Sequence, residues 1–324
     1  MLLSQIGFYT MYDRRAATAN EHTRLTRAEI ILTGRCNFNC PYCRHVGGPD
    51  EDLQRVKDMI CEFAKQGLYS IRLSGGEPTI YPGIIELVEL AKSLNIMHIA
   101  LSTNGAASQS LYQKLIDAGA NDFSISLDAC CAEDGDSMAG GVKGAWAKVV
   151  ANIKFVASQV YTTVGIVLTE SNIAAVNDTV RFAHTLGVAD IRVIPAAQCA
   201  DRFKDIQVDA ELRKAHMILA YRYRNFKDGR PVRGLRPCDN KRCPLVLDDV
   251  AVNQGEHFPC IIYMREGGKA IGKVGPDMRE ERAKYYREHD VSQDTICNRN
   301  CLDVCVDYNN RYAELHKSAE SGKL

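Results

Sequence analysis

The chain of 324 residues carries no net charge, because 40 lysines and arginines are balanced by 40 aspartates and glutamates. This balance excludes a globally basic nucleic-acid-coating protein and an acidic tail protein, so nucleic acid is not an expected partner. The sequence also lacks any run of eighteen apolar residues, and no membrane-spanning helix is predicted. It contains no low-complexity tract, and a hydrophobic content of 46% with 25% charged residues is typical of a folded globular protein.

Cysteine is too rare for a protein that is held together by disulfide bonds. Thirteen cysteines in 324 residues fall well below the roughly 8–10% of small disulfide scaffolds, and a chain long enough for about two domains does not need such bonds. The N-terminal segment MLLSQIGFYTMYDRRA lacks the basic-then-apolar order of a secretory signal peptide. We therefore expect a cytoplasmic protein whose thiols are reduced and serve another purpose.

The cysteines that are present concentrate toward the two ends of the chain. Three lie within eight residues, at Cys36, Cys40 and Cys43. Six lie in the C-terminal part of the chain: Cys238, Cys243, Cys260, Cys297, Cys301 and Cys305. Four are scattered: Cys61, Cys130, Cys131 and Cys199. Clustering of this kind indicates metal binding, and thiolates suit iron–sulfur clusters or zinc.

Short apolar runs alternate with helical patterns from residue 28 onward. Six runs are expected to form strands: 29–33, 69–74, 97–102, 122–128, 162–168 and 190–194. Between them, the 3.6-residue periodicity predicts a first helix that ends at Gly67 and further helices over 82–93, 108–118, 142–158 and 172–186. Six strand–helix units predict an α/β fold with a parallel sheet.

The alternation of side chains along the strands favours an incomplete barrel. In the second strand, Ile71 and Leu73 share one face, and Arg72 and Ser74 share the other. A doubly wound sheet would be apolar on both faces, whereas one polar inner face fits a splayed barrel around a polar ligand. The expected architecture is a partial (β/α)6 barrel of the α/β class with a small cysteine-rich C-terminal domain.

The alternation of strands and helices stops after Pro195. Residues 207–226 are expected to be helical, and the segment 201–242 holds twelve lysines and arginines against six aspartates and glutamates. From about residue 235 the sequence becomes rich in cysteines and turns, which predicts a small domain organised by metal. The expected units are an N-terminal extension, the partial barrel, a basic helical linker and the C-terminal domain: 1–27, 28–200, 201–234 and 235–324.

Two motifs directly follow the first two expected strands. The segment Cys36-x3-Cys40-x2-Cys43 offers three thiolates on one short loop, which can hold three corners of a [4Fe–4S] cluster and leave the fourth iron open. Zinc with a distant fourth ligand is the alternative. The segment 74–78, SGGEP, has two glycines that let the backbone approach a ligand closely, and its glutamate can accept hydrogen bonds from an ammonium group. Because ligands bind at the carboxyl ends of parallel strands, both motifs are expected in one site.

With Tyr42 before the last cysteine and GGEP about thirty residues further on, the sequence resembles the radical SAM superfamily over residues 28–195. The resemblance implies that Cys36, Cys40 and Cys43 bind a [4Fe–4S] cluster whose open iron is chelated by S-adenosylmethionine. It also implies that an electron from a donor such as flavodoxin or ferredoxin cleaves S-adenosylmethionine to a 5′-deoxyadenosyl radical, which removes a hydrogen atom from the substrate.

The same resemblance assigns roles to further residues. The implied cofactor-binding residues are Tyr42, Gly75, Gly76, Glu77, Ser126 and Ala197. Arg72 and Ser102 resemble residues that contact substrate in the related molybdenum-cofactor cyclase, and strand parity also turns both inward. Cys199, beyond the sixth strand, could return a hydrogen atom to a substrate radical, as in radical epimerases. A radical epimerase is therefore one alternative function.

The C-terminal cysteines resemble those of SPASM and twitch domains, which hold auxiliary [4Fe–4S] clusters. Cys243, Gly255 and Cys260 match the Cys-x(9–15)-Gly-x4-Cys hairpin that opens such domains. Of the later Cys-x2-Cys-x5-Cys-x3-Cys run, the Cys301-x3-Cys305 spacing alone is present. Six cysteines cannot fully ligate two clusters, so one auxiliary cluster is favoured, with Cys238, Cys297, Cys301 and Cys305 as candidates for its remaining ligands. A four-thiolate zinc site is the alternative.

The expected function is that of a radical SAM enzyme that oxidises, cross-links or rearranges its substrate with the help of an auxiliary cluster. A metal-binding structural protein without enzymatic activity is a second alternative. Only 35 residues precede Cys36, against about eighty in the peptide-binding domain of many peptide modifiers, which favours a small molecule or a peptide delivered by another protein. The basic segment presents either a solvated helix face or arginines for an anionic substrate. These arginines are Arg222, Arg224, Arg230, Arg233, Arg236 and Arg242.

Overall fold

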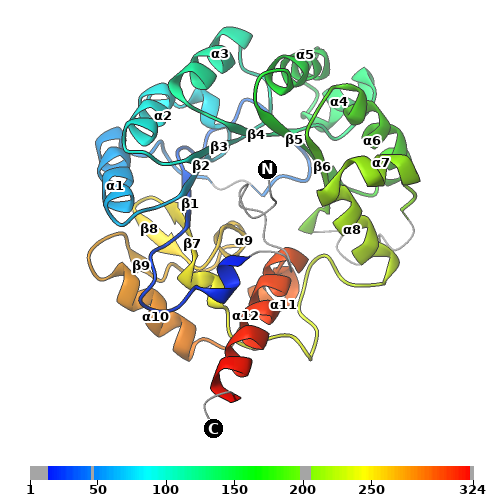
Figure 1. Ribbon diagram of the computed structural model, residues 1–324. Coiled ribbons are helices and arrows are strands. Elements are labelled where there is room, and N and C mark those ends of the chain that lie inside the picture. Colours follow the sequence, from blue (N-terminus) through cyan, green and yellow to red (C-terminus); the bar gives the residue numbers. More distant parts are fainter. Residues whose placement is uncertain (1–13, 45–46, 198–205, 322–324) are drawn as a thin grey trace.

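The computed structural model describes residues 14–44, 47–197 and 206–321, which form one nine-stranded sheet with helices around it (Figure 1). The strand order is β6-β5-β4-β3-β2-β1-β7-β8-β9. Strands β1 to β7 run parallel to their neighbours, and β8 and β9 are added antiparallel. Among the described strands β6 and β9 form the two edges, so the sheet curves around a centre without closing.

The six strands expected from the sequence are all present. They are β1 (Arg27–Ile31), β2 (Ser70–Ser74), β3 (His98–Thr103), β4 (Asp122–Ser126), β5 (Tyr161–Leu168) and β6 (Asp190–Pro195). The added strands are β7 (Asp249–Asn253), β8 (Glu256–Phe258) and β9 (Gly272–Lys273). The partial barrel is therefore confirmed, and its sheet continues into the cysteine-rich part of the chain.

Helices cover the outer face of the barrel (Figure 1). They are α1 (Leu53–Lys65), α2 (Ile84–Ser93), α3 (Gln109–Ala118), α4 (Ala132–Met138), α5 (Ala145–Ala157) and α6 (Val176–Thr185). In α1, the Asp52 side chain accepts from the Arg55 N–H at 2.8 Å and caps the helix, and Gly67 ends the following turn with φ +79°. Helix α4 was not expected, because its sequence AEDGDSM has no apolar periodicity.

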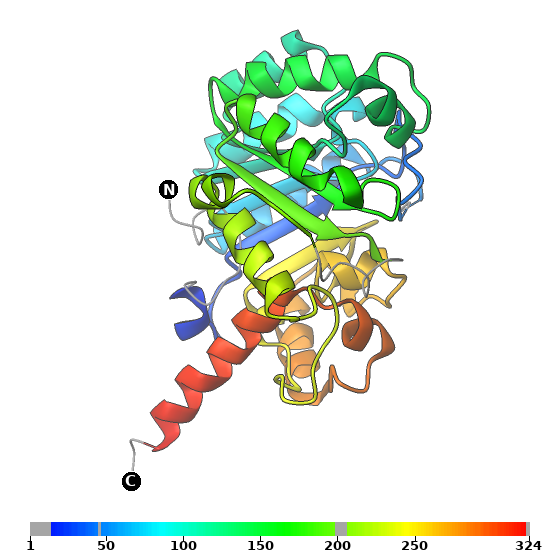
Figure 2. The same ribbon diagram turned by 90° about the vertical axis from the view of Figure 1, so that its right-hand side faces the viewer.

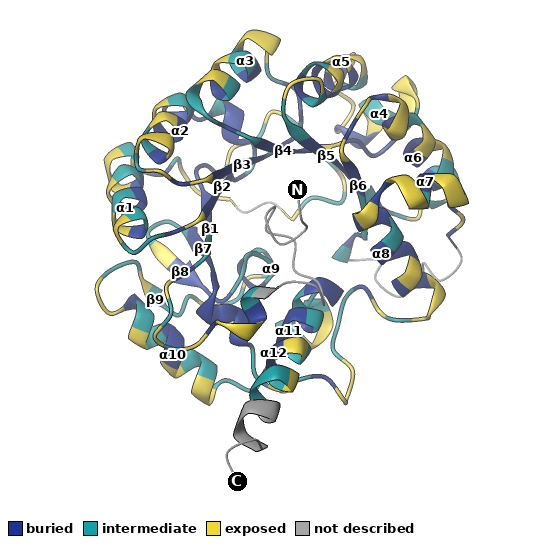
Figure 3. Cartoon of the chain, viewed as in Figure 1, coloured by how far each residue is buried: buried dark blue, intermediate teal, exposed yellow. Residues whose placement is uncertain are grey.

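Strand parity separates two faces, as the sequence predicted. Ile71 and Leu73 of β2 are fully buried in the core between the sheet and the helices. Arg72 and Ser74 of the same strand line a cavity on the inner face. The buried strands and the exposed outer helix surfaces are visible in Figure 3. The polar face of β2 therefore borders a cavity, and its apolar face is buried in the core.

The C-terminal part packs against the open side of the barrel (Figure 2). Its helices are α7 (Ala210–Ala215), α8 (Met217–Lys227), α9 (Ile261–Arg265), α10 (Met278–Glu288), α11 (Thr295–Asn300) and α12 (Asp303–Ser321). The segment 207–226, expected to be helical, contains two helices, because the backbone between them is extended at His216, with φ −128° and ψ 109°. Helix α8 packs on β6, where Asp190 accepts from the Ile218 N–H at 3.0 Å. None of the described helices is long and apolar enough to cross a bilayer.

Candidate active site

The three N-terminal thiols lie on the loop that follows β1. Cys36, Cys40 and Cys43 are half-buried and free. Burial, with contributions from Asp128 and the other two thiols, raises the pKa of Cys40 to about 12. Burial also raises the pKa of Cys43. Three neighbouring thiols on one loop are soft donors of the kind that iron–sulfur clusters take, so the donor set fits such a cluster.

The glycines of the GGEP segment pack directly on the backbone of this cysteine loop. The Gly76 N–H donates to the Thr33 carbonyl at 2.7 Å, and the Glu77 N–H donates to the Arg35 carbonyl at 2.9 Å. A Cβ on Gly75 would lie 2.5 Å from the Thr33 carbonyl oxygen, and a Cβ on Gly76 would overlap the Arg35 carbonyl oxygen. The two motifs that the sequence predicted to share a site are therefore in contact through their backbones.

The carboxylate of Glu77 ties the GGEP segment to the end of β3. It is fully buried and accepts from the Thr79 N–H at 3.0 Å, the Thr79 hydroxyl at 2.6 Å, the Thr103 hydroxyl at 2.7 Å and the Asn104 N–H at 2.7 Å. Burial raises its pKa, and these donors oppose the rise. The side chain is thus engaged by the protein, and a contact of Glu77 with a cofactor amine stays a prediction.

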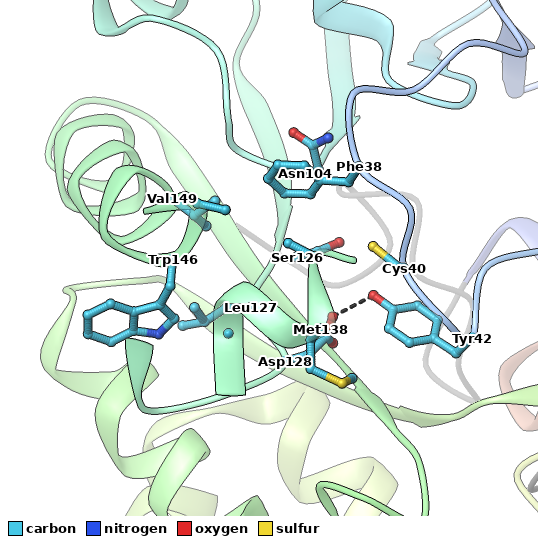
Figure 4. Close-up of a pocket in the computed structure, with 13 residues that line it drawn as sticks. Phe38, Cys40, Tyr42, Asn104, Ser126, Leu127, Asp128, Met138, Trp146 and Val149 are labelled. Carbon is cyan, nitrogen blue, oxygen red and sulfur yellow. Dashed lines mark hydrogen bonds between the residues drawn. The ribbon is translucent and has the colours of Figure 1, made fainter. Parts of the chain in front are cut away.

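A cavity of about 60 Å³ lies beside the cysteine loop (Figure 4). Cys40, Tyr42 and Ser126 line it, although Ser126 comes from the end of β4. The Tyr42 hydroxyl donates to Asp128 at 2.5 Å, and burial raises the pKa of this carboxyl to about 6. The structure therefore brings two of the predicted cofactor residues together with a predicted cluster ligand. Ala197 does not line this cavity.

A larger cavity of about 290 Å³ lies on the inner face of the barrel. The Arg72 Nη1 donates to the Ser102 hydroxyl at 2.9 Å, so the two predicted substrate residues contact each other at its wall. Arg192 of β6 and Arg265 of α9 also line the cavity, and neither was among the site residues predicted from the sequence. Strand parity could have found Arg192, whereas no sequence signal places Arg265 there.

Five of the six C-terminal cysteines surround one small cavity of about 30 Å³. They are Cys243, Cys260, Cys297, Cys301 and Cys305. Burial raises the pKa of every one of them, and neighbouring thiols raise those of Cys260, Cys297, Cys301 and Cys305 further. Cys238 is exposed and does not line the cavity. The five convergent thiols fit a second iron–sulfur cluster by the same donor chemistry as the first.

Two contacts connect the C-terminal thiol group to the cysteine loop and the GGEP segment. Arg265, the last residue of α9, donates to the Ser74 hydroxyl and to the Gly75 carbonyl, each at 3.3 Å. The neighbouring Glu266 pairs with Arg44 of the cysteine loop at 2.5 Å. In addition, Cys260 and Cys305 line the inner cavity as well as their own. The C-terminal thiol group therefore borders the inner cavity, whereas Cys40 of the loop lines the separate cavity of about 60 Å³.

The predicted hydrogen donor Cys199 lies outside the described residues, and the described part of the basic segment 201–242 is partly buried. In the basic segment, the solvated-face interpretation is wrong for Arg222, which is 1% exposed and pairs with Asp303 at 3.0 Å. Arg230 pairs with Asp307 at 2.5 Å in a partly buried position. Part of this segment faces inward because α8 packs between β6 and α12.

The fold and the site together define an α/β partial-barrel enzyme with a thiol-rich site at the carboxyl ends of its strands. The chain matches the model of the radical SAM superfamily over residues 30–183. It is 38% identical over 113 residues to a probable GTP 3′,8-cyclase of Methanothermobacter marburgensis, a match that covers 34% of this chain and 37% of that protein. A probable GTP 3′,8-cyclase of Methanococcus aeolicus is 27% identical over 294 residues, which cover 80% of this chain and 96% of that protein.

A solved structure gives the same picture of the fold. SuiB of Streptococcus suis, bound to S-adenosylmethionine, superposes with a TM-score of 0.60 at 14% identity, over 88% of this chain and 72% of that one. This likeness extends past the barrel into the cysteine-rich part. The match to the Methanothermobacter marburgensis protein thus covers 37% of that protein. The similarity in fold to SuiB covers 88% of this chain.

Proposed function

We propose that this enzyme binds a [4Fe–4S] cluster through Cys36, Cys40 and Cys43, together with S-adenosylmethionine, and removes a hydrogen atom from a substrate held in the inner cavity. The observation that carries the proposal is the backbone contact between the cysteine loop and the GGEP segment beside a cavity that Tyr42 and Ser126 share. When bound and reduced, the cluster and cofactor supply a 5′-deoxyadenosyl radical, and the electron comes from a donor such as flavodoxin or ferredoxin.

The residues of the chain would position and shield this chemistry. Tyr42, fixed by its hydrogen bond to Asp128, offers an aromatic surface beside Cys40. Ser126 offers an exposed hydroxyl at the end of β4. The paired glycines keep the cysteine loop against the strand ends, since any side chain there would separate the two segments.

We further propose that four of the five convergent C-terminal thiols hold one auxiliary [4Fe–4S] cluster. Cys260 and Cys305 line both cavities, which supports a role for this cluster next to the substrate, either in accepting an electron or in binding the substrate directly. The net reaction would then be an oxidation, a cross-link or a rearrangement. The exposed Cys238 is the weakest of the predicted ligands.

Anaerobic reconstitution with iron and sulfide tests the proposal. We expect about eight irons per chain and 5′-deoxyadenosine when S-adenosylmethionine and a reductant are added. Zinc without iron, or no 5′-deoxyadenosine, would contradict the enzyme function. About twelve irons would contradict the single auxiliary cluster.

A further inference from the structure

Three arginines from distant parts of the sequence converge on the inner cavity. Arg72 comes from β2, Arg192 from β6 and Arg222 from α8, and all three line the cavity of about 290 Å³. Elements from both the barrel and the C-terminal part are thus needed to assemble the group. The cavity is small for a ligand site, which suits a small molecule.

The carboxylates of the same cavity already have partners, which are Arg72 and His98 for Asp122 and Arg27 for the other two. Asp122 accepts from Arg72 at 3.3 Å and lies 2.9 Å from the His98 Nε2. Glu29 and Asp249 both pair with Arg27, at 2.9 and 2.7 Å. These three carboxylates are the acidic residues that line the cavity, against five arginines. The wall therefore carries an excess of positive charge.

Arg192 lacks an ion-pair partner among the described residues, and Arg222 is incompletely hydrogen-bonded. The hydrogen bond of Arg192 goes to the neutral hydroxyl of Ser124 at 2.9 Å, and Arg192 has no ion pair within the described ranges. Arg222 is 1% exposed, and one nitrogen pairs with Asp303 at 3.0 Å while its Nε has no hydrogen-bond partner among the described residues. Burying a guanidinium with unmet hydrogen-bonding capacity is costly unless an anion completes it.

Mutual repulsion within the group adds to this cost. Burial, together with the positive charges of Arg72 and Arg222, lowers the pKa of Arg192 to about 10, and Glu29 and Asp122 oppose this shift. An arginine fork matches the two oxygens of a carboxylate or phosphate, and such a pair is strengthened where water is excluded. The chemistry of the wall is therefore that of an oxyanion receptor.

We propose that Arg192, with Arg72 and Arg222 beside it, binds the carboxylate or phosphate group of a small anionic substrate. This inference rests on the proposed function, because it names the class of substrate for the same cavity. The anionic group would lie on the inner face of the barrel, and the rest of the molecule would extend toward Ser74 and Cys260 on the same wall. The arginines would act by binding and orienting the substrate, not by taking part in bond breaking.

Calorimetric titration of the anaerobically reconstituted protein tests the inference, with inorganic phosphate and succinate as separate probes and glycerol as the neutral control. We expect saturable binding of at least one anion and at least a tenfold weaker affinity in Arg192→Gln. Arg192→Lys keeps a positive charge and should lose less anion affinity than Arg192→Gln. Arg181→Gln on α6 removes an exposed guanidinium and should bind like the wild type. The anion that binds more tightly distinguishes a phosphate from a carboxylate substrate.

A second pair of variants keeps the test valid if Arg192→Gln does not fold. Thr163 of β5 lines the cavity. Thr163→Asp leaves every arginine in place but adds a carboxylate, so it should abolish anion binding, whereas Thr163→Val keeps the shape and should retain it. No saturable binding to the wild type, or equal affinities in Thr163→Asp and Thr163→Val, would overturn the proposal.

The two proposals can fail separately in these samples. Anion binding is measured without reductant, and 5′-deoxyadenosine is measured with it. Binding that is lost in Thr163→Asp, in a protein that forms no 5′-deoxyadenosine, would support the anion site and contradict the radical chemistry. Formation of 5′-deoxyadenosine without any anion binding would do the reverse.

Discussion

Cys36, Cys40 and Cys43 come from one eight-residue loop, whereas the five convergent C-terminal thiols come from three separated stretches of chain. The loop thiols stand beside a cavity with polar groups such as Ser126 and Asp128. The cavity of the C-terminal group is lined mainly by apolar and aromatic side chains, including Tyr263 and Tyr285. The polar cavity beside the loop suits a site that exchanges a polar cofactor. The apolar cavity of the C-terminal thiols suits an iron–sulfur cluster that stays bound.

The sharpest test of this comparison removes one loop thiol. Cys40→Ala leaves two thiols at the loop, so 5′-deoxyadenosine formation should fall to background and about four irons per chain should be lost. Cys61→Ala, which removes a half-buried thiol of α1, should change neither. Iron analysis and chromatography of the cleavage products make the measurement. Normal cleavage by Cys40→Ala would break the assignment of the two groups.

The next largest effect is expected in the C-terminal group. The double change Cys243→Ala and Cys260→Ala leaves three of the five convergent thiols. It should lower iron by about four per chain and leave some cleavage of S-adenosylmethionine that is uncoupled from product. Cys238→Ser removes an exposed thiol outside the convergent group, so iron content and coupling should stay at wild-type values. If Cys238→Ser lost four irons instead, the ligand set read from the cavity would be incorrect.

The third prediction concerns a glycine substitution that changes the packing of the cysteine loop and leaves its three thiols in place. Gly76→Ala puts a methyl group onto the Arg35 carbonyl oxygen and should cost about 1–3 kcal/mol of stability, with a marked loss of cofactor cleavage. Gly275→Ala adds the same methyl group in ordinary contact, 4.0 Å from the nearest atom, and should be close to neutral. Denaturant unfolding and product analysis measure the two effects. Equal stability of both variants would show that the loop can move away.

The smallest effect concerns how α8, the helix of Arg222, is attached to the barrel. Burial raises the pKa of Asp190 to about 6, from 3.8. The folded state then holds a proton more tightly than the unfolded state. The contribution of Asp190 to the free energy of unfolding is therefore fully present below about pH 4. It is lost as the pH rises to 6, which lowers the free energy of unfolding by at most about 3 kcal/mol. Denaturant unfolding at several pH values should show a gain of Asp190→Asn over the wild type that grows across this window. A constant difference would show that Asp190 does not titrate there.

Much of the barrel could be predicted because its signals are local. Apolar runs, helix periodicity and the alternation of Ile71 with Arg72 depend on residues close in sequence, and the cysteine loop needs one short spacing. Helix α4 could not be predicted, because its sequence has no apolar periodicity. The break at His216 could not be predicted either, because it does not interrupt an apolar pattern. The continuation of the sheet through β7, which pairs with β1, depends on residues more than 200 positions apart and leaves no periodic signal.

The sequence by itself determined the class of fold, the three loop thiols and the paired glycines of the GGEP segment, since each is encoded within a few residues. Only the tertiary structure decided which C-terminal thiols converge, that Glu77 is closed in by four donors, and that Arg222 is buried beside Arg192. These outcomes depend on which elements pack together. A charge that looks solvated in sequence becomes part of a binding wall once its helix is placed against β6, because burial changes both its partners and its energy.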